Sequence, residues 1–147
     1  MPDTVVTNPY TVTPVQPARI PYEWPTISAH ILPAIKDGMS EMELFGRLVS
    51  GNFQAIRIHS FRADATAVLR VDTADDKLVC WIGYLGGKHS GGPKALTNLV
   101  RSVVSAIEQK AKDIGCQEVR LGGRDWAFIL RDYLPYDGMT NGLRKAI

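Results

Sequence analysis

The hydrophobic and polar pattern of the chain is organised around residues 77–124, which contain an apolar strand, a glycine-rich turn, a long amphipathic helix and a second strand. Within this stretch, residues 78–82 are apolar at consecutive positions, which is typical of a strand buried on both faces near the middle of a sheet. The pattern therefore predicts a central strand over residues 77–85.

A long amphipathic helix is predicted over residues 93–114. Its apolar residues recur at three- and four-residue spacing, while most of its charged residues fall on the opposite side. Pro93 suits the first helical turn, and Gly115 can adopt the left-handed conformation that ends a helix. Alternation over residues 117–121 then predicts a second strand. A strand, helix and strand in this order favour a parallel pair with a right-handed crossover.

Shorter patterns predict the remaining elements, and the whole forms an α/β (α+β) domain. Asp75 and Asp76 provide a tight polar turn into the central strand, and the strands before it are most simply antiparallel. The other predicted elements are a helix over residues 24–38 that Pro33 kinks or divides, a helix over residues 40–51, strands over residues 53–61 and 65–73, a short helix over residues 126–134, and an edge strand over residues 138–147.

Composition limits the classes of protein to which the chain can belong. Its 147 residues with 45% hydrophobic content fit one globular domain with a real core. The net charge of +2 is nearly balanced and gives no specific signal for nucleic acid. No apolar run is long enough for a membrane span, and the N-terminus lacks the pattern of a signal peptide. Cys80 and Cys116 are expected to be buried thiols in a reduced cytoplasmic setting, and a disulfide between the adjacent strands is the alternative.

Six of the nine prolines lie in the first 25 residues, and almost no charged residue accompanies them before Arg19. Such a segment cannot form a helix, so residues 1–22 are predicted to be an extended N-terminal arm that precedes a domain over residues 23–147. Three alternatives stay open for this arm: a disordered tail, a strap around its own domain, or a contact with neighbouring chains.

A glycine-rich segment joins the central strand to the long helix. Free N–H groups and the positive end of the helix dipole meet there, and glycines let a ligand approach the backbone, so the segment suits a phosphate or pyrophosphate. It matches neither the Walker A motif nor the dinucleotide-binding fingerprint, and a flexible connecting loop is the alternative. The candidate cofactor-binding residues are Gly86, Gly87, Lys88, Gly91, Gly92 and Lys94.

The order of elements resembles the GNAT (Gcn5-related N-acetyltransferase) superfamily, and the resemblance extends over residues 24–147. It is nearest to the divergent GNAT-like proteins that tailed bacteriophages encode. Four short sequences carry it: Trp24-Pro25, Gly51-Asn52-Phe53-Gln54, Gly115-Cys116 and Gly123-Arg124-Asp125-Trp126.

The resemblance implies a GNAT-like mixed, mostly antiparallel sheet with helices on both faces. It also implies that acetyl-coenzyme A, if the chain is an active enzyme, lays its pyrophosphate on the loop between the central strand and the long helix. The usual pyrophosphate-loop pattern of the superfamily is absent from residues 86–92, although this segment lies in the corresponding place.

Acetyl transfer to an amine needs a base for the amine and an acid for the departing thiolate. Asp72 is the candidate base, and Tyr133 or Tyr136 the candidate acid. The alternatives are a surface carboxylate for Asp72 and helix-face packing for the tyrosines. No histidine lies at metal-ligand spacing from a cysteine or carboxylate, so no metal site is predicted.

Three functions follow from these patterns. The first is a virion-associated structural or assembly protein that keeps the GNAT-like fold as a scaffold, works in multiple copies, and holds other virion protein chains through residues 1–22. The second is an active acetyl-CoA-dependent N-acetyltransferase. The third is a nucleotide or coenzyme A binder without catalysis. The expected location is the virion or the host cytoplasm.

Overall fold

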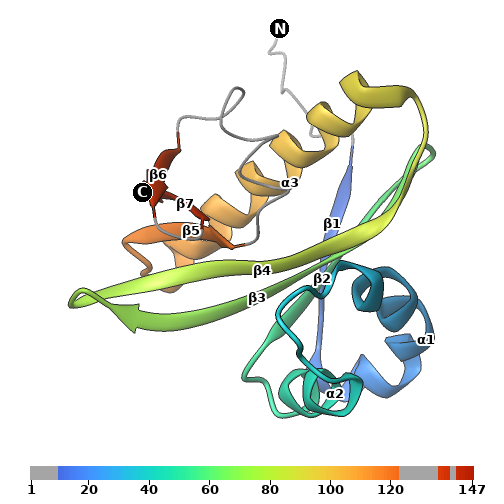
Figure 1. The fold of residues 1–147 in the computed structure, drawn as a ribbon, viewed down its shortest axis with the longest axis horizontal. Helices are drawn as coiled ribbons and strands as arrows, with labels where there is room; N and C mark the ends of the chain where they lie inside the picture. Colours follow the sequence, from blue (N-terminus) through green and yellow to red (C-terminus); the bar gives the residue numbers. More distant parts are fainter. Residues whose placement is uncertain (1–9, 123–135, 140–141) are drawn as a thin grey trace, which may run out of the picture.

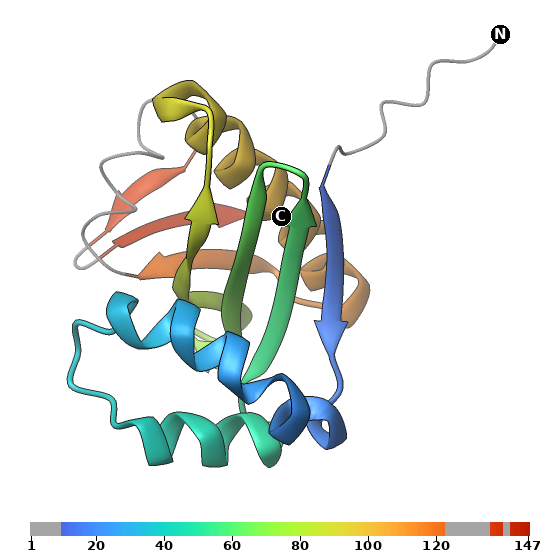
Figure 2. The ribbon, with the colours of Figure 1, turned by 90° about the vertical axis from the view of Figure 1, so that its right-hand side faces the viewer.

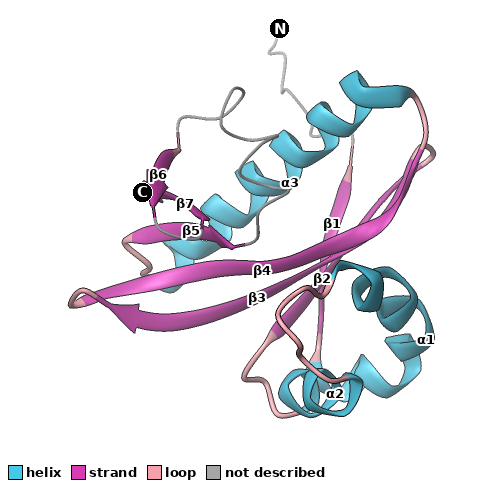
Figure 3. Ribbon diagram, in the orientation of Figure 1, coloured by secondary structure: helices cyan, strands magenta, loops and turns pink. Residues whose placement is uncertain are grey.

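A computed structural model describes residues 10–122, 136–139 and 142–147. In chain order its elements are β1 (Thr11–Val15), a 3-10 turn (Pro17–Arg19), α1 (Ile20–Ile31), a second 3-10 turn (Leu32–Ala34), α2 (Glu41–Val49), β2 (Gln54–Ser60), β3 (Ala63–Ala74), β4 (Lys77–His89), α3 (Gly92–Ile114), β5 (Glu118–Gly122), β6 (Asp137–Met139) and β7 (Gly142–Ala146). The strands form one sheet in the order β1-β2-β3-β4-β5-β7-β6. Helix α3 covers one face, and α1 and α2 cover the other (Figures 1 and 3).

Strand pairing confirms the predicted mixed, mostly antiparallel sheet. Among the described strands, β4 and β5 form a parallel pair, and the other neighbours are antiparallel. Asp75 and Asp76 make the turn between β3 and β4 with φ of 53° and 61°. Two consecutive residues with positive φ are the geometry of a type I′ hairpin, whose twist matches that of the flanking strands. Local turn chemistry therefore sets the register of the longest hairpin.

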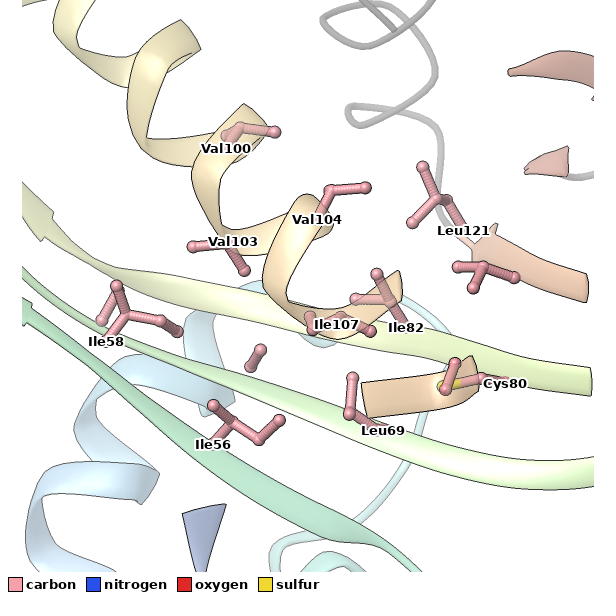
Figure 4. Packing of buried hydrophobic residues seen from close by; sticks show 14 of the residues in the cluster. Ile56, Ile58, Leu69, Cys80, Ile82, Val100, Val103, Val104, Ile107 and Leu121 are labelled. Carbon is pink, nitrogen blue, oxygen red and sulfur yellow. The ribbon is translucent and has the colours of Figure 1, made fainter. Parts of the chain in front are cut away.

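The main core lies between α3 and the sheet (Figure 4). The middle of the apolar face of α3 is buried there, with Val103, Val104 and Ile107 each 0% exposed. They pack against Ile82 of β4 and the neighbouring strands. The predicted helix and the predicted central strand are both confirmed. The apolar residues of the helix recur with a 3.6-residue period, so they share one face, and this face packs on the apolar strand.

A second core lies between the sheet and the pair α1 and α2. Helix α2 begins as predicted, since the Ser40 hydroxyl accepts the N–H of Glu43 at 3.1 Å. The first helix differs from the prediction because it begins at Ile20, and Pro21 occupies its first turn. Pro25, which was expected to open it, lies inside. Pro33 divides the segment as predicted, since the α-helix ends before it and a 3-10 turn follows.

Part of the segment predicted as an arm belongs to the sheet. Strand β1 pairs antiparallel with β2, from Thr11 opposite His59 to Val15 opposite Ala55. Val15 is buried under α1 and α2, while Val12 packs against the core under α3. The edge position explains why Pro14 is tolerated, since an edge strand has one side without ladder partners. Residues 1–9 lie outside the described residues, and their contact with other chains stays a prediction.

The C-terminal segment forms two strands where one was predicted. Strand β7 lies between β5 and β6, so β6 and not β7 forms this edge of the sheet. Strand β6 ends at Met139 and β7 begins at Gly142, whereas the sequence predicts a single strand over residues 138–147. The predicted helix over residues 126–134 also lies outside the described residues.

A buried polar network ties α1 to the sheet. His30, 7% exposed, has its Nδ1 2.9 Å from the hydroxyl oxygen of Thr66, and its Nε2 lies 3.7 Å from a carboxylate oxygen of Asp64. Arg57 binds the other oxygen of Asp64 and also Glu23 of α1, at 3.3 Å. Burial lowers the pKa of His30 below 6.5, which the positive charges of Arg57 and Lys88 reinforce and Asp64 opposes. Neutral His30 is therefore the form that fits the native packing.

This network predicts a pH dependence of stability. A histidine whose pKa is lower in the folded state contributes its full stability above the unfolded pKa, about 6.5, and loses it as the pH falls toward the folded value. The free energy of unfolding of the wild type, measured with urea, should therefore fall between pH 7.5 and 5 by more than that of His30→Gln. His59→Gln, which changes an exposed histidine, is the control and should behave as the wild type. An equal weakening in His30→Gln would contradict the assignment.

The pairing of β1 predicts where the chain tolerates truncation. Deletion of residues 2–9 should leave the free energy of unfolding unchanged, since the described core contacts begin at Tyr10. Deletion of residues 2–18 removes β1 and exposes the side of β2, so unfolding should become easier by on the order of 3 kcal/mol. Urea titrations of both truncated chains measure this difference. Equal stability of the two would show that β1 adds nothing to the domain.

Candidate functional site

Strand β4 is paired on both sides for only part of its length. Val79 to Ile82 pair with Glu118 to Leu121 of β5. Beyond Ile82, β4 continues to His89 and pairs with β3 alone among the described strands. Figure 2 shows the reason, since β5 and β7 run crosswise to the upper part of β4. The outer edge of residues 83–89 thus presents backbone N–H and C=O groups without a partner strand in the described part of the chain.

A β-bulge lies where the two strands separate. Leu69 of β3 is opposite Ile82 and Val68 is opposite Tyr84, so Gly83 is the extra residue. An extra residue reverses the alternation of the strand. Ile82 therefore faces the core under α3, while Tyr84 faces α1 and α2. The bulge therefore brings the polar side chain of Tyr84 to the point where β4 and β5 separate. Regular alternation would have directed this side chain into the apolar core under α3.

The free edge of β4 leads directly to the N-terminus of α3. Gly91 and Gly92 have φ of 103° and 78°, a left-handed geometry that favours glycine, and no side chain caps the helix. Pro93 has no N–H, so the free donors of the first turn are the N–H groups of Gly91, Gly92 and Lys94. These donors and the helix dipole suit an anion.

Basic residues lie close to this helix end in sequence or in space. Lys88 and Lys94 are exposed, and the backbone N–H of Ser90 donates to the carbonyl of Arg62 at 2.8 Å. A Cβ placed on Gly91 would lie 3.2 Å from Nη1 of Arg62. Within the described residues, no carboxylate forms an ion pair with any of the three cations. Arg62 and Lys94 thus add positive charge near the helix end, and the binding of an anion there stays a prediction.

Two predicted loop residues belong to the strand instead. Gly86 and Gly87 lie in β4, opposite Thr66 and Ala65. A Cβ on Gly86 would overlap the carbonyl of His30, and one on Gly87 would overlap the backbone of Asp64 and Ala65. These glycines allow α1 and β3 to approach β4 closely, which explains their presence without a ligand. The connection is shorter than predicted and consists of Ser90 and Gly91.

The structure does not bring the predicted catalytic residues together. Asp72 is exposed on β3, opposite Val79, and accepts the N–H of Thr73 at 2.8 Å. At about 3.3 Å per residue, it lies roughly 30 Å along the hairpin from Lys88. Tyr136 is 6% exposed in the core under α3 and donates to Glu108 at 2.7 Å. Burial raises its pKa far above the ordinary tyrosine value. Tyr133 lies outside the described residues.

A pair of residues that the sequence did not single out lies at the separation point. The Tyr84 hydroxyl donates to a carboxylate oxygen of Asp37 at 2.6 Å. Burial, and then this hydrogen bond, raise the pKa of Tyr84, so the phenol stays protonated at neutral pH. Asp37 is exposed and follows the second 3-10 turn. The two are 47 residues apart in sequence, and only the bulge at Gly83 turns Tyr84 toward Asp37.

The described residues contain no cluster of His, Cys, Asp and Glu that could hold a metal ion. Cys80 and Cys116 are free and buried, as expected, and burial raises the pKa of the Cys80 thiol to about 12. Cys80 therefore stays a protonated thiol in the apolar core. None of the helices in the described ranges is both long and apolar enough to cross a membrane.

Comparison with known proteins gives a likeness in structure. No family model and no curated protein sequence matches the chain. The chain is similar to the crystal structure of an aminoglycoside acetyltransferase from an uncultured soil metagenomic sample, with a TM-score of 0.55 and 14% identity, over 92% of this chain and 94% of that one. A probable N-acyltransferase from Enterococcus faecalis V583 aligns with a TM-score of 0.45 and 12% identity, over 87% of this chain and 32% of that one. The first likeness, over nearly the whole of both chains, gives this chain the GNAT-like fold.

Proposed function

We propose that the chain binds acetyl-coenzyme A, or a related acyl thioester, and transfers the acyl group to an amine. One observation carries the proposal: in the part of the chain that the structure describes, the edge of β4 beyond the bulge has no partner strand, and it leads to a helix N-terminus close to Arg62 and Lys94. Coenzyme A has an extended arm with two amide groups and a pyrophosphate at one end. The strand edge matches the amides, and the helix end matches the pyrophosphate.

In this arrangement the thioester lies near Gly83, where β4 and β5 separate. The amine nitrogen bonds to the acyl carbon while the carbon–sulfur bond breaks, and the departing thiolate takes a proton from water. Asp37 accepts the proton of the amine, and Tyr84 holds that carboxylate in place through its hydrogen bond. Free N–H groups on the strand edge polarise the thioester carbonyl.

This proposal gives the predicted residues unequal roles. Gly91, Gly92, Lys88 and Lys94 keep the anion-binding role that the sequence predicts. Gly86 and Gly87 contribute the backbone of the strand edge. Tyr84 and Asp37 replace Asp72, Tyr133 and Tyr136 as the proposed polar groups beside the thioester, because they lie next to the bulge.

The predicted virion role stays a second hypothesis. It rests on residues 1–9, because Val12 and Val15 pack within the domain itself and are not available to a neighbouring chain. A GNAT-like scaffold that serves an assembly would need neither a free strand edge nor a basic helix end. Binding of acetyl-coenzyme A therefore separates the two hypotheses.

Isothermal titration calorimetry tests the binding step. The wild type should bind acetyl-coenzyme A, and Lys94→Glu should bind about tenfold more weakly, because one favourable charge near the pyrophosphate is reversed. Lys112→Glu changes an exposed lysine at the other end of α3 and is the matched control, which should bind as the wild type. Asp37→Asn should bind normally and transfer acetyl groups poorly in a thiol-release assay. No binding by the wild type at millimolar acetyl-coenzyme A would sink the proposal.

A further inference from the structure

A tryptophan lies between two guanidinium groups on the face of the sheet opposite α3. The Cζ atom of Arg70 is 5.3 Å from the ring centroid of Trp81, and that of Arg120 is 5.6 Å away. The three residues are direct neighbours across β3, β4 and β5, since Trp81 is opposite Arg70 on one side and Arg120 on the other. A cation over an indole is attracted by the ring electrons, so the stack fixes all three side chains.

The two arginines differ in how their charge is balanced. Arg120 is 6% exposed, forms an ion pair with buried Glu118, and binds Asp75 at 2.8 Å. Arg70 is exposed, and among the described residues no carboxylate forms an ion pair with it. Arg120 therefore positions the indole, because its own charge is already balanced. Within the described ranges, Arg70 therefore has guanidinium donors without a carboxylate partner, and such donors can bind an anion.

Arg70 lies beside the proposed reaction site. The residue directly before Arg70 is Leu69, which is opposite Ile82, the last residue of β4 that pairs with β5. Trp81 and Tyr84 both face away from α3, on either side of the bulge, and at about 3.3 Å per residue they are roughly 7–10 Å apart along β4. The positive charge of Arg70 also acts on Tyr84, whose pKa it lowers slightly against the larger effect of burial.

In the described part of the chain, the nearest carboxylate on the same strand forms no ion pair with Arg70. Asp72 lies two residues further along β3, and its side chain accepts the N–H of Thr73. The Asp72 carboxylate thus has a hydrogen-bond partner other than Arg70.

We propose that Arg70, held on Trp81, binds an anionic group of the acyl acceptor, so the acceptor is an amine that also carries a carboxylate or a phosphate several bonds from its nitrogen. The assignment of that amine as an acceptor rests on the proposed acyl transfer. The anion site itself is inferred only from the contacts of Arg70 and Arg120 with the Trp81 ring. An acceptor with several bonds between its nitrogen and its anionic group places the anion on Arg70 and the nitrogen near Asp37 and Gly83.

Matched acceptors test the inference. The wild type should transfer acetyl from acetyl-coenzyme A to 6-aminohexanoate or 6-aminohexyl phosphate with a kcat/KM at least about tenfold above that for n-hexylamine, because a charge-assisted bidentate contact is gained. The ratio between the two anionic acceptors shows whether the carboxylate or the phosphate is preferred. Arg70→Ala should abolish the preference through a higher KM, with kcat little changed. Arg101→Ala, which removes an exposed arginine of α3 on the other side of the sheet, should keep it.

A binding measurement without acetyl-coenzyme A separates this inference from the proposed function. Addition of 6-aminohexanoate should shift the indole N–H resonance of Trp81, identified by its loss in Trp81→Phe, and Arg70→Ala should abolish the shift. A shift that depends on Arg70 without any acyl transfer would sink the proposed function and leave the anion site. Equal use of n-hexylamine and the anionic acceptors, or no shift in the wild type, would overturn the anion site.

Discussion

The parallel pairing between β4 and β5 ends at Ile82, and the arrangement of the candidate site depends on this limit. From Val79 to Ile82, β4 has a partner strand on both sides. Beyond it, β4 is held by β3 and by the close approach of α1, which Gly86 allows. A strand that leaves its neighbour while it stays attached elsewhere has polar backbone groups available for a ligand. The same strand then delivers the chain to the N-terminus of α3.

The bulge at Gly83 links this backbone feature to side-chain chemistry. It sends Ile82 into the core under α3 and Tyr84 toward Asp37. A Cβ on Gly83 would meet only the carbonyl of Val68, at 3.8 Å, so the bulge is not forced by a lack of space at that residue. The apolar requirements of the two cores, one on each face, are enough to fix the position where the alternation changes.

Elements with local signals were predicted from the sequence, and long-range contacts were not. The period of α3, the Ser40 cap and the Asp75-Asp76 turn all depend on residues within a few positions of one another. The extension of β4 through Gly86 was missed, because glycines indicate a loop unless the carbonyl of His30 is known to lie against them. The strand at Thr11–Val15 was missed for a similar reason, since its partner β2 is far away in sequence.

The same distinction applies to the candidate site. The basic helix end at Gly91 to Lys94 was predicted, because glycines, a proline and lysines are adjacent in sequence. The pairs that the folded chain creates were not: Tyr84 with Asp37, and Arg70 with Trp81 and Arg120. The sequence also does not indicate that Tyr136, the candidate acid, forms a buried hydrogen bond with Glu108.

Hydrogen exchange along β4 tests the central claim most directly, because it reports on each backbone N–H of the strand. In the free protein, the outward-facing amides of residues 83–87 should exchange much faster than those of residues 79–82, which β3 and β5 hold from both sides. Saturating acetyl-coenzyme A should slow the exchange of residues 83–87, together with Gly91 and Gly92. Slow exchange of residues 83–87 in the free protein, or no change with acetyl-coenzyme A, would contradict the claim that this strand edge is a thioester-binding site.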